Sequence, residues 1–446
     1  MAGTVLTRTI STLIAALIVM TAALPLRAQS LLRDPDVEYA LRQLADPIFT
    51  AAGLTPGSID ILVVNDNKLN AFVIDTRHVL IHSGLILKVK TAEELQAVIA
   101  HEVAHIANGH ISRRLANMRS ASNAAKFGLA MALAVGAASG NAEAAAGIAV
   151  GTSSSARRVL LGHTRAEEAS ADQSALRYMS MRNIDPTAMS DVLDYFRGQE
   201  LLSAGRQDPY VLSHPLNRDR VRAVQGYAAA YKNIAKDNPD GNYWFARARA
   251  KLGGFLRNPG WTMRRIDKSD TSDIAVMARA IALHRTPKPA AAVAEINRLV
   301  ASRPNDPFYQ ELKGQILLES GNFPAAVNAY GTAVKLAPRN GLILAGYGRA
   351  LLALNTRDSN ARALTALEQA RARDEQDERM MRDLAVAYAK AGNNGMASLA
   401  TAERYVLSGK LKDAGLHAKR AVDLLPRGSA GWNRAQDVLN AAKSAE

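Results

Sequence analysis

The chain has 446 residues, of which 48% are hydrophobic and 22% charged, so it is long enough for two or three domains with cores of their own. It contains no cysteine, which excludes disulfides, thiolate metal sites and a lipid anchor attached through cysteine. The net charge of +14 favours acidic membrane surfaces or acidic partners, and the sequence has no nucleic-acid-binding motif.

The first 28 residues have the layout of a secretory signal peptide. Arg8 precedes an apolar run, residues 10–24, and Ala28 is a small residue at the expected cleavage point. The run is short for a membrane span, and a retained N-terminal anchor is the alternative interpretation. We therefore expect export with cleavage near Ala28, which also removes the positive charges of Arg8 and Arg27.

Three apolar, β-branched runs lie between Ser58 and Ile86, punctuated by Asn, Asp and Gly. They predict a small antiparallel sheet. Thr91 and Glu94 then form a capping box ahead of an apolar-periodic stretch, so a long helix is expected to start near Thr91. A second helix is expected from about Thr164 to Arg182, and a turn follows at 213–220.

Ala, Gly and Ser dominate residues 121–155, between the two expected helices. The segment predicts one or two closely packed helices with a glycine-rich break, and its apolar stretches are too short to cross a bilayer. Two roles are open: close helix packing, or a cover over a cleft that also contacts the membrane.

After about residue 235 the sequence changes to short helical patterns separated by Gly and Pro turns. Small residues and prolines recur 34 residues apart, as in Ala292 and Ala326, or Pro304 and Pro338. A 34-residue period of this kind is the tetratricopeptide (TPR) signature. We expect about four repeats, the first and last degenerate, with a slip of the period at 355–362; an unrelated helical bundle is the alternative. Stacked TPRs provide a concave surface for peptides or proteins.

The segment AHEVAHIANGH, residues 100–110, places His101 and His105 one helical turn apart, so both imidazoles project from nearly the same face. Glu102 lies beside the pair, where it can accept a proton without binding the metal. This is the HExxH arrangement of zinc hydrolases, although the motif also occurs by chance. On a regular helix His110 would face away, which leaves it as a support for a ligand or as a surface histidine.

A third ligand is therefore expected from another helix, and RAEEASAD, residues 165–172, supplies one. Glu168 would complete a His₂Glu set, and Ala171 is small enough for two helices to pack closely. Asp172, one turn further on, could accept the other ring N–H of a ligand histidine or act as a proton donor. A solvated acidic face is the alternative interpretation.

HEVAH with EASAD, preceded by a strand bearing Asn70-Ala71-Phe72, resembles the zinc-peptidase family that includes the CAAX prenyl proteases and the heat-shock protease HtpX. With a signal peptide and TPRs, the chain is similar to a periplasmic branch of that family that serves β-barrel assembly in Gram-negative bacteria. The resemblance implies one Zn²⁺ per chain at His101, His105 and Glu168, with Glu102 as the catalytic base.

The same resemblance implies a later HPxxxxR element, matched here by His214, Pro215 and Arg220. In the TPR-bearing relatives this histidine can occupy the open position of zinc and hold the enzyme latent; a structural His-Pro turn is the alternative. Substrates would be unfolded or stalled outer-membrane proteins, docked along the strand edge at Asn70, Ala71 and Phe72. The TPRs would dock the barrel-assembly machinery, with peripheral membrane contact as a further expectation.

The expected fold class is α+β: a mainly helical zincin-type metalloprotease domain with a small antiparallel sheet, followed by an all-α TPR solenoid. The expected boundaries are 1–28 for the signal peptide, 29–235 for the protease and 236–446 for the TPRs. Two other functions compete with the exported endopeptidase. One is a TPR chaperone or scaffold with a latent or inactive protease, and the other is an integral-membrane prenyl-type protease.

Overall fold

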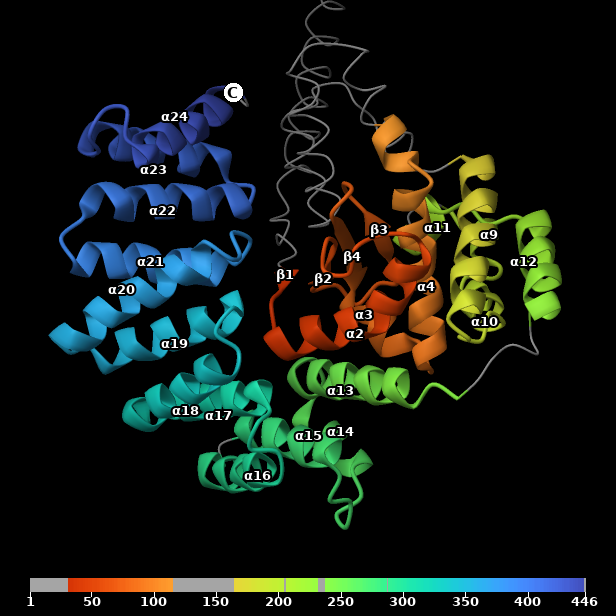
Figure 1. Ribbon diagram of the computed structural model, residues 1–446, viewed down its shortest axis with the longest axis horizontal. Helices are drawn as coiled ribbons and strands as arrows, with labels where there is room; N and C mark the ends of the chain where they lie inside the picture. The colour runs from red at the N-terminus through yellow and green to blue at the C-terminus, as the bar shows by residue number, and fades with distance from the viewer. Residues whose placement is uncertain (1–30, 115–163, 204–205, 232–236, 287, 445–446) are drawn as a thin grey trace, which may run out of the picture.

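The computed structural model describes residues 31–114, 164–203, 206–231, 237–286 and 288–444. The expected signal peptide and the small-residue segment 121–155 lie outside these residues. Figure 1 shows an N-terminal α+β part and a C-terminal helical solenoid, joined through α13 (Pro239–Leu256). In the part of the chain that is described, no helix combines the length and the apolar character needed to span a bilayer.

The α+β part contains one mixed sheet with the strand order β1-β2-β4-β3. Its strands are β1 (Leu31–Leu32), β2 (Asp60–Val64), β3 (Ala71–Val73) and β4 (His78–His82). The expectation of an antiparallel sheet is wrong for the central pair, because β2 and β4 run parallel. The chain forms β3 at the edge and then returns to place β4 beside β2. The two longest strands thereby lie in the centre of the sheet.

Helices α2 (Pro35–Ala51), α3 (Ser83–Lys88) and α4 (Ala92–Ala107) contact this sheet, and α11 (Pro209–Ser213) contacts its edge strand β3. Helices α9 (Arg165–Met181) and α10 (Ala188–Asp194) pack in turn on α4, and α12 (Arg218–Tyr231) packs on α9 and α10. The 3₁₀ turn η1 (Gln199–Leu201) follows α10. Successive side chains along each strand point to opposite faces of the sheet. Ile61 and Val63 of β2 enter the main core, whereas Leu62 and Val64 join a smaller cluster on the other face.

The two helices that the sequence predicts most firmly begin where expected. Thr91 caps α4, its hydroxyl accepting from the backbone N–H of Glu94 at 3.2 Å. The reciprocal half of the capping box is absent from α4, because the Glu94 carboxylate accepts instead from the N–H of Lys90 at 2.7 Å. Thr164 caps α9 in a complete capping box with Glu167. Both helices are therefore fixed at their N-termini by local sequence.

The solenoid consists of antiparallel helix pairs, which confirms the TPR prediction and the α+β class. The helices are α14 (Pro259–Arg265), α15 (Asp273–His284), α16 (Pro289–Ser302), α17 (Pro307–Glu319), α18 (Phe323–Leu336), α19 (Gly341–Leu354), α20 (Arg357–Arg371), α21 (Glu378–Lys390), α22 (Asn394–Leu407), α23 (Leu411–Leu424) and α24 (Ala430–Lys443). From α15 to α24 the described residues form five pairs, one more than expected.

The slip in the repeat lies later than predicted. Only residues 355 and 356 separate α19 from α20, and Asn355 supports this tight turn with a positive φ of 54°. The additional residues fall in the loop 372–377 between α20 and α21. Repeat periodicity alone could not assign them, because an insertion before or after a helix displaces the later pattern equally.

Helix α13 belongs to both parts of the molecule. Its Phe245 and Leu252 enter the core of the α+β part. Its buried Arg247 bridges Asp36 of α2 and Asp306, the N-cap of α17, each at 2.7 Å. A buried cation with one partner in each part fixes their relative orientation, because moving either part would leave a charge uncompensated. The boundary at residues 235 and 236 stays a prediction.

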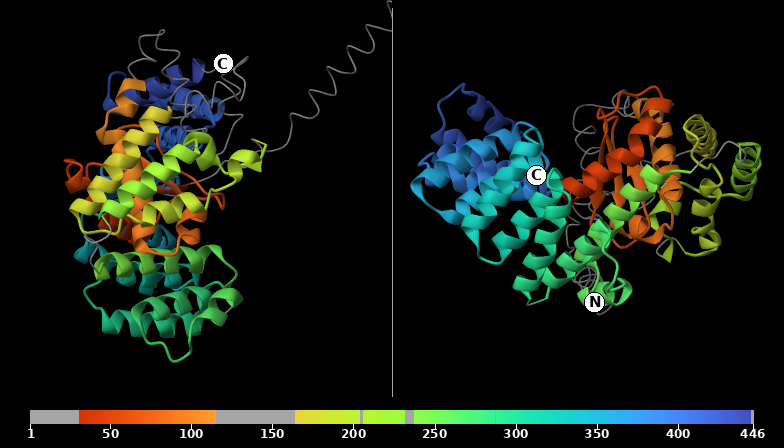
Figure 2. Two further views of the ribbon diagram at one scale, coloured as in Figure 1. Left: turned by 90° about the vertical axis from the view of Figure 1, so that its right-hand side faces the viewer. Right: turned by 60° about the horizontal axis from the view of Figure 1, so that its bottom comes forward.

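The loop 372–377 makes a second connection between the two parts. Asp374 forms an ion pair with Arg33, which lies next to β1 and also contacts Glu38 at 2.7 Å. Gln376 Nε2 lies 2.8 Å from the Nε2 of His78 at the start of β4. The residues that lengthen the repeat therefore fasten the solenoid to the sheet, and Figure 2 shows the solenoid curving beside the α+β part. We call this loop the clasp.

Replacing Asp374 with alanine is expected to lower the free energy of unfolding by about 1–3 kcal/mol, because it leaves the mostly buried Arg33 guanidinium with one partner fewer. Thermal unfolding of the full chain measures the effect. The control is Glu375→Ala in the same loop, since the Glu375 side chain is 73% exposed and should change little. Equal stability of the two variants would show that the clasp contributes no stabilisation.

Candidate metal centre

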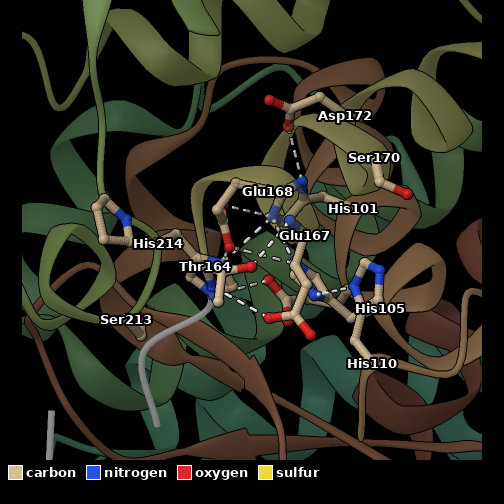
Figure 3. Close-up of polar contacts among 12 residues, drawn as sticks. His101, His105, His110, Thr164, Glu167, Glu168, Ser170, Asp172, Ser213 and His214 are labelled. Atoms are coloured by element: carbon tan, nitrogen blue, oxygen red, sulfur yellow. Dashed lines mark hydrogen bonds and ion pairs between the residues drawn. The ribbon is translucent and has the colours of Figure 1, made fainter. Parts of the chain in front are cut away.

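Helix α4 holds two histidines and a glutamate in the interior of the α+β part. His101, Glu102 and His105 are completely buried from solvent among apolar side chains. The Nε2 atoms of the two histidines lie 3.1 Å apart, as expected for side chains one turn apart on one face. Figure 3 shows both rings directed toward the carboxylate of Glu168. Three ionisable groups in an apolar interior require partners or a ligand to offset their burial.

Helix α9 supplies these partners. Glu168 Oε2 lies 3.4 Å from His101 Nε2, and Glu168 Oε1 lies 3.4 Å from His105 Nε2. Asp172 Oδ1 lies 2.9 Å from the other ring nitrogen, Nδ1, of His101. The fully buried Ala171 allows α9 to pack closely on α4. The structure therefore brings together all five residues that the two sequence motifs single out.

His214, at the C-terminal end of α11, completes the group. Its Nδ1 lies 3.2 Å from His101 Nε2 and 3.0 Å from Glu168 Oε1, and its Nε2 lies 3.4 Å from Glu102 Oε1. The ring is held by Tyr210, whose ring centroid is 4.6 Å away and which stacks in turn on Phe196. Sequence reasoning gave no role to Tyr210 or Phe196, and a lone aromatic before a His-Pro turn carries no signal for one.

The donor set fits a tetrahedral divalent ion. One ligand atom from each of His101, His105, Glu168 and His214 lies within 4.8 Å of the others. Zinc binds nitrogen and oxygen ligands at about 2.0–2.1 Å, so the corners of a regular tetrahedron around it are about 3.3 Å apart. Five separations among these donors, counting both oxygens of Glu168, are 3.0–3.4 Å and lie close to that edge. The residues present therefore fit a zinc ion in their number, chemistry and proximity.

Glu102 differs from these four residues, because both of its carboxylate oxygens are buried without a hydrogen-bond partner among the described residues. Burial raises the pKa of Glu102, against the opposing charges of His214 and His101. A carboxylate next to the ligand group, but left to bind something else, is suited to proton transfer. This arrangement separates Glu102 from the metal-ligating set.

An arginine balances the acidic side of the site. Arg220 contacts Glu168 Oε2 at 2.5 Å and holds Asp172 through two bonds of 2.6 and 2.9 Å. Burial raises the pKa of Glu168 and of Asp172, but the charges of Arg220 and the histidines outweigh it, and both pKa values are lowered. Burial likewise lowers the pKa of His101, yet its bonds to Asp172 and Glu168 raise that pKa to about 10. Both carboxylates therefore stay ionised.

His110 lies in the interior rather than on the surface. Helix α4 ends at Ala107, and Gly109 adopts a positive φ of 72° that a side chain would oppose. The chain therefore turns back, and His110 Nδ1 lies 2.9 Å from His105 Nδ1 with the residue 2% exposed. A regular helix would have directed His110 the other way, which is why the sequence left two possibilities open.

The segment Asn70-Ala71-Phe72 lies at an edge of the sheet. Ala71 and Phe72 begin β3, one of the two edge strands, and the carbonyl of Asn70 accepts from the N–H of His82 at 2.9 Å. Ala71 faces the main core, whereas Phe72 faces the smaller cluster. The Oδ1 atom of Asn70 is buried without a hydrogen-bond partner among the described residues. A role in binding substrate stays a prediction.

Comparison with known proteins gives a consistent result. Residues 32–228 match the model of Peptidase family M48. The chain is 28% identical over 221 residues to a protein of Vibrio cholerae serotype O1, provisionally named a beta-barrel assembly-enhancing protease, covering 50% of this chain and 45% of that one. It is 24% identical over 306 residues to the Beta-barrel assembly-enhancing protease of Escherichia coli K12, covering 67% of this chain and 61% of that one.

The chain thus spans about half to three fifths of the length of these relatives. A solved thermophilic TPR protein of Thermus thermophilus is 19% identical, with a TM-score of 0.26, and covers 38% of this chain and all of that one. The matched region of the family model contains β2 to β4 and every residue of the candidate metal centre. Residues 32–228 thus match Peptidase family M48, and the chain is similar to proteins named beta-barrel assembly-enhancing proteases.

Proposed function

We propose that this chain is a zinc-dependent endopeptidase that degrades unfolded or stalled outer-membrane proteins in the periplasm. The observation that supports it most is the close approach of buried donor atoms from His101, His105 and Glu168, beside a Glu102 carboxylate that lacks a hydrogen-bond partner among the described residues. When bound, zinc would act as a Lewis acid that polarises a peptide carbonyl and makes water a better nucleophile near neutral pH.

The side chains of the site have separate tasks in this proposal. His101, His105 and Glu168 would hold the metal, and Asp172 fixes the ring of His101 through Nδ1. Arg220 compensates the charges of Glu168 and Asp172 inside the apolar interior. Glu102 takes a proton from the attacking water and delivers it to the leaving amine; burial raises its pKa, which suits a group that must hold and release a proton.

Substrate class and location are inferred from the relatives and from the edge strand. The names of the relatives concern beta-barrel assembly, which suggests outer-membrane proteins and a periplasmic location after removal of residues 1–28. An extended substrate would pair with β3 at Asn70, Ala71 and Phe72. This mode of binding uses main-chain hydrogen bonds and therefore suits unfolded polypeptides of varied sequence. The TPRs would dock the assembly machinery. The net charge of +14 suits contact with an acidic membrane surface.

His214 would keep the site latent, because its Nδ1 lies 3.2 Å from His101 Nε2 and 3.0 Å from Glu168 Oε1, where it would serve as a fourth ligand in place of water. Replacing it with alanine is expected to increase basal cleavage of an unfolded protein such as casein by about tenfold or more. Initial rates on zinc-loaded protein measure this. Ser213→Ala, one residue away and outside the metal group, serves as the control. Unchanged or lower activity of the His214 variant would refute the latch.

A second function is a TPR chaperone or scaffold in which proteolysis is rare. The observation in its favour is the closed state of the site, where His101, Glu102, His105 and His214 all have no measurable exposure. Cells that carry Glu102→Gln distinguish the two functions. Loss of outer-membrane protein quality control in these cells supports the endopeptidase, whereas full function supports the scaffold.

A further inference from the structure

A pocket lies at the junction of the two parts, away from the metal centre. It is about 870 Å³ in volume and is lined by α2, by α13 and by the turns that precede α17 and α19. Ligand pockets in proteins typically have volumes of about 300–1,000 Å³. The pocket is wide and open to solvent. None of its lining residues belongs to the site proposed for catalysis.

The floor of this junction pocket is aromatic. Tyr39 of α2 packs with its ring centroid 5.2 Å from Trp244 of α13 and 4.9 Å from Phe308 of α17. Despite these contacts Tyr39 remains 38% exposed, as does Leu336 at the rim. These side chains therefore do not fill the junction pocket completely. The apolar surface left open can accept another aromatic ring in an edge-to-face or offset arrangement.

The rim of the pocket is positively charged. Arg339 is exposed and has no ion-pair partner among the described residues, and Arg42 has only Asp60 at 3.4 Å, with both side chains about half exposed. Arg303 contacts Asp273 at 3.1 Å with its side chain 55% exposed. The exposed Arg42–Asp60 pair binds weakly, so the guanidinium groups of Arg42 and of Arg339 can turn to another anion.

The acidic side chain in the lining does not cancel this charge. Asp306 caps α17 by accepting from the N–H groups of Phe308 and Tyr309. Both of its oxygens also bind the Arg247 guanidinium beneath the floor. Asp306 is thereby compensated by an arginine outside the lining, which leaves Arg42, Arg303 and Arg339 as the other charged side chains of the lining.

We propose that the junction pocket binds a segment of unfolded polypeptide in which an aromatic side chain lies next to a carboxylate. The aromatic ring would rest on Tyr39, and the carboxylate would be held by Arg339 and Arg42. A chain terminus and an acidic side chain offer the same anionic chemistry, and both are available in unfolded chains. The site is independent of metal binding and would retain a client beside the M48 domain while its extended part reaches β3.

Binding of acetylated tripeptides to the full-length, zinc-loaded Glu102→Gln protein tests this, because that variant should leave the peptides intact. The first two peptides both end in phenylalanine, one with a free C-terminal carboxylate and the other with a C-terminal amide. A third peptide has an internal Asp-Phe and an amidated end, and a fourth has alanine in place of phenylalanine. Calorimetry is expected to show binding of the free phenylalanine carboxylate, with affinity at least about tenfold lower for the amide and for the alanine peptide.

The variants locate the site. Arg339→Glu is expected to weaken binding by about tenfold, and Tyr39→Ala by a similar factor, whereas Arg357→Glu, an exposed arginine on α20 outside the pocket, should bind as the parent does. If the amidated Asp-Phe peptide binds as tightly as the peptide with a free phenylalanine carboxylate, acidic side chains can supply the carboxylate. If the amidated Asp-Phe peptide does not bind, the carboxylate comes from the chain terminus. Binding that is unaffected by Arg339→Glu, or that is as tight for the amidated phenylalanine peptide as for the two peptides that carry a carboxylate, would overturn the proposal. None of these outcomes depends on cleavage.

Discussion

Replacing Glu102 with glutamine is expected to reduce peptide-bond cleavage by about 10²–10⁴-fold while the metal stays bound. Glutamine preserves the shape of the side chain but cannot accept a proton. The metal should remain because Glu102 is outside the group of four ligand atoms, and the charged group that it faces is His214 Nε2 at 3.4 Å. Casein cleavage and metal content of the same preparation give the two readouts.

The comparison requires a glutamate that is remote from the site. Glu375→Gln, in the exposed clasp loop, should retain both activity and metal. Cleavage by Glu102→Gln within about tenfold of the parent would show that another group transfers the proton. Loss of metal from this variant would instead show that Glu102 belongs to the ligand set.

Replacing Glu168 with glutamine is expected to remove most of the stabilisation that zinc confers. A ligand that binds only the folded state stabilises it by about 4 kcal/mol at a thousand times its Kd, so the parent should melt at a clearly higher temperature with zinc. Glutamine keeps the volume but not the charge that offsets the cation and Arg220. Thermal unfolding with and without zinc, after treatment with a chelator, measures the difference.

Glu167→Gln is the matched control, since the neighbouring carboxylate completes the capping box of α9 and glutamine can accept the same bond from the Thr164 N–H. This variant should respond to zinc as the parent does. A Glu168 variant that is still stabilised by zinc to the same extent would mean that the ion binds elsewhere.

Local sequence was sufficient for the elements that hold the site. The spacing of His101 and His105 defines one helical face, and the caps at Thr91 and Thr164 define where both helices begin. Each of these features depends on residues within one or two turns. The small Ala171 also indicated a close approach of the two helices, which the structure shows.

The remaining features depend on contacts between distant segments. Nothing in the local sequence shows that β4 pairs in parallel with β2, that Arg220 binds the carboxylates of α9, or that Arg33 meets Asp374 across 341 residues. The interior position of His110 could not be predicted either, because it depends on the positive φ of Gly109. That single backbone angle reverses the direction in which the His110 side chain points. Such pairings are selected by burial and charge compensation in the folded state, and the pattern of one segment does not contain them.

X-ray anomalous scattering at the zinc edge, on crystals of the purified chain, tests the central claim most directly. We expect one strong anomalous peak per chain, within about 2.0–2.2 Å of His101 Nε2, His105 Nε2 and a Glu168 oxygen. An empty position between these three side chains in zinc-loaded crystals, or a peak held by other residues, would contradict the account.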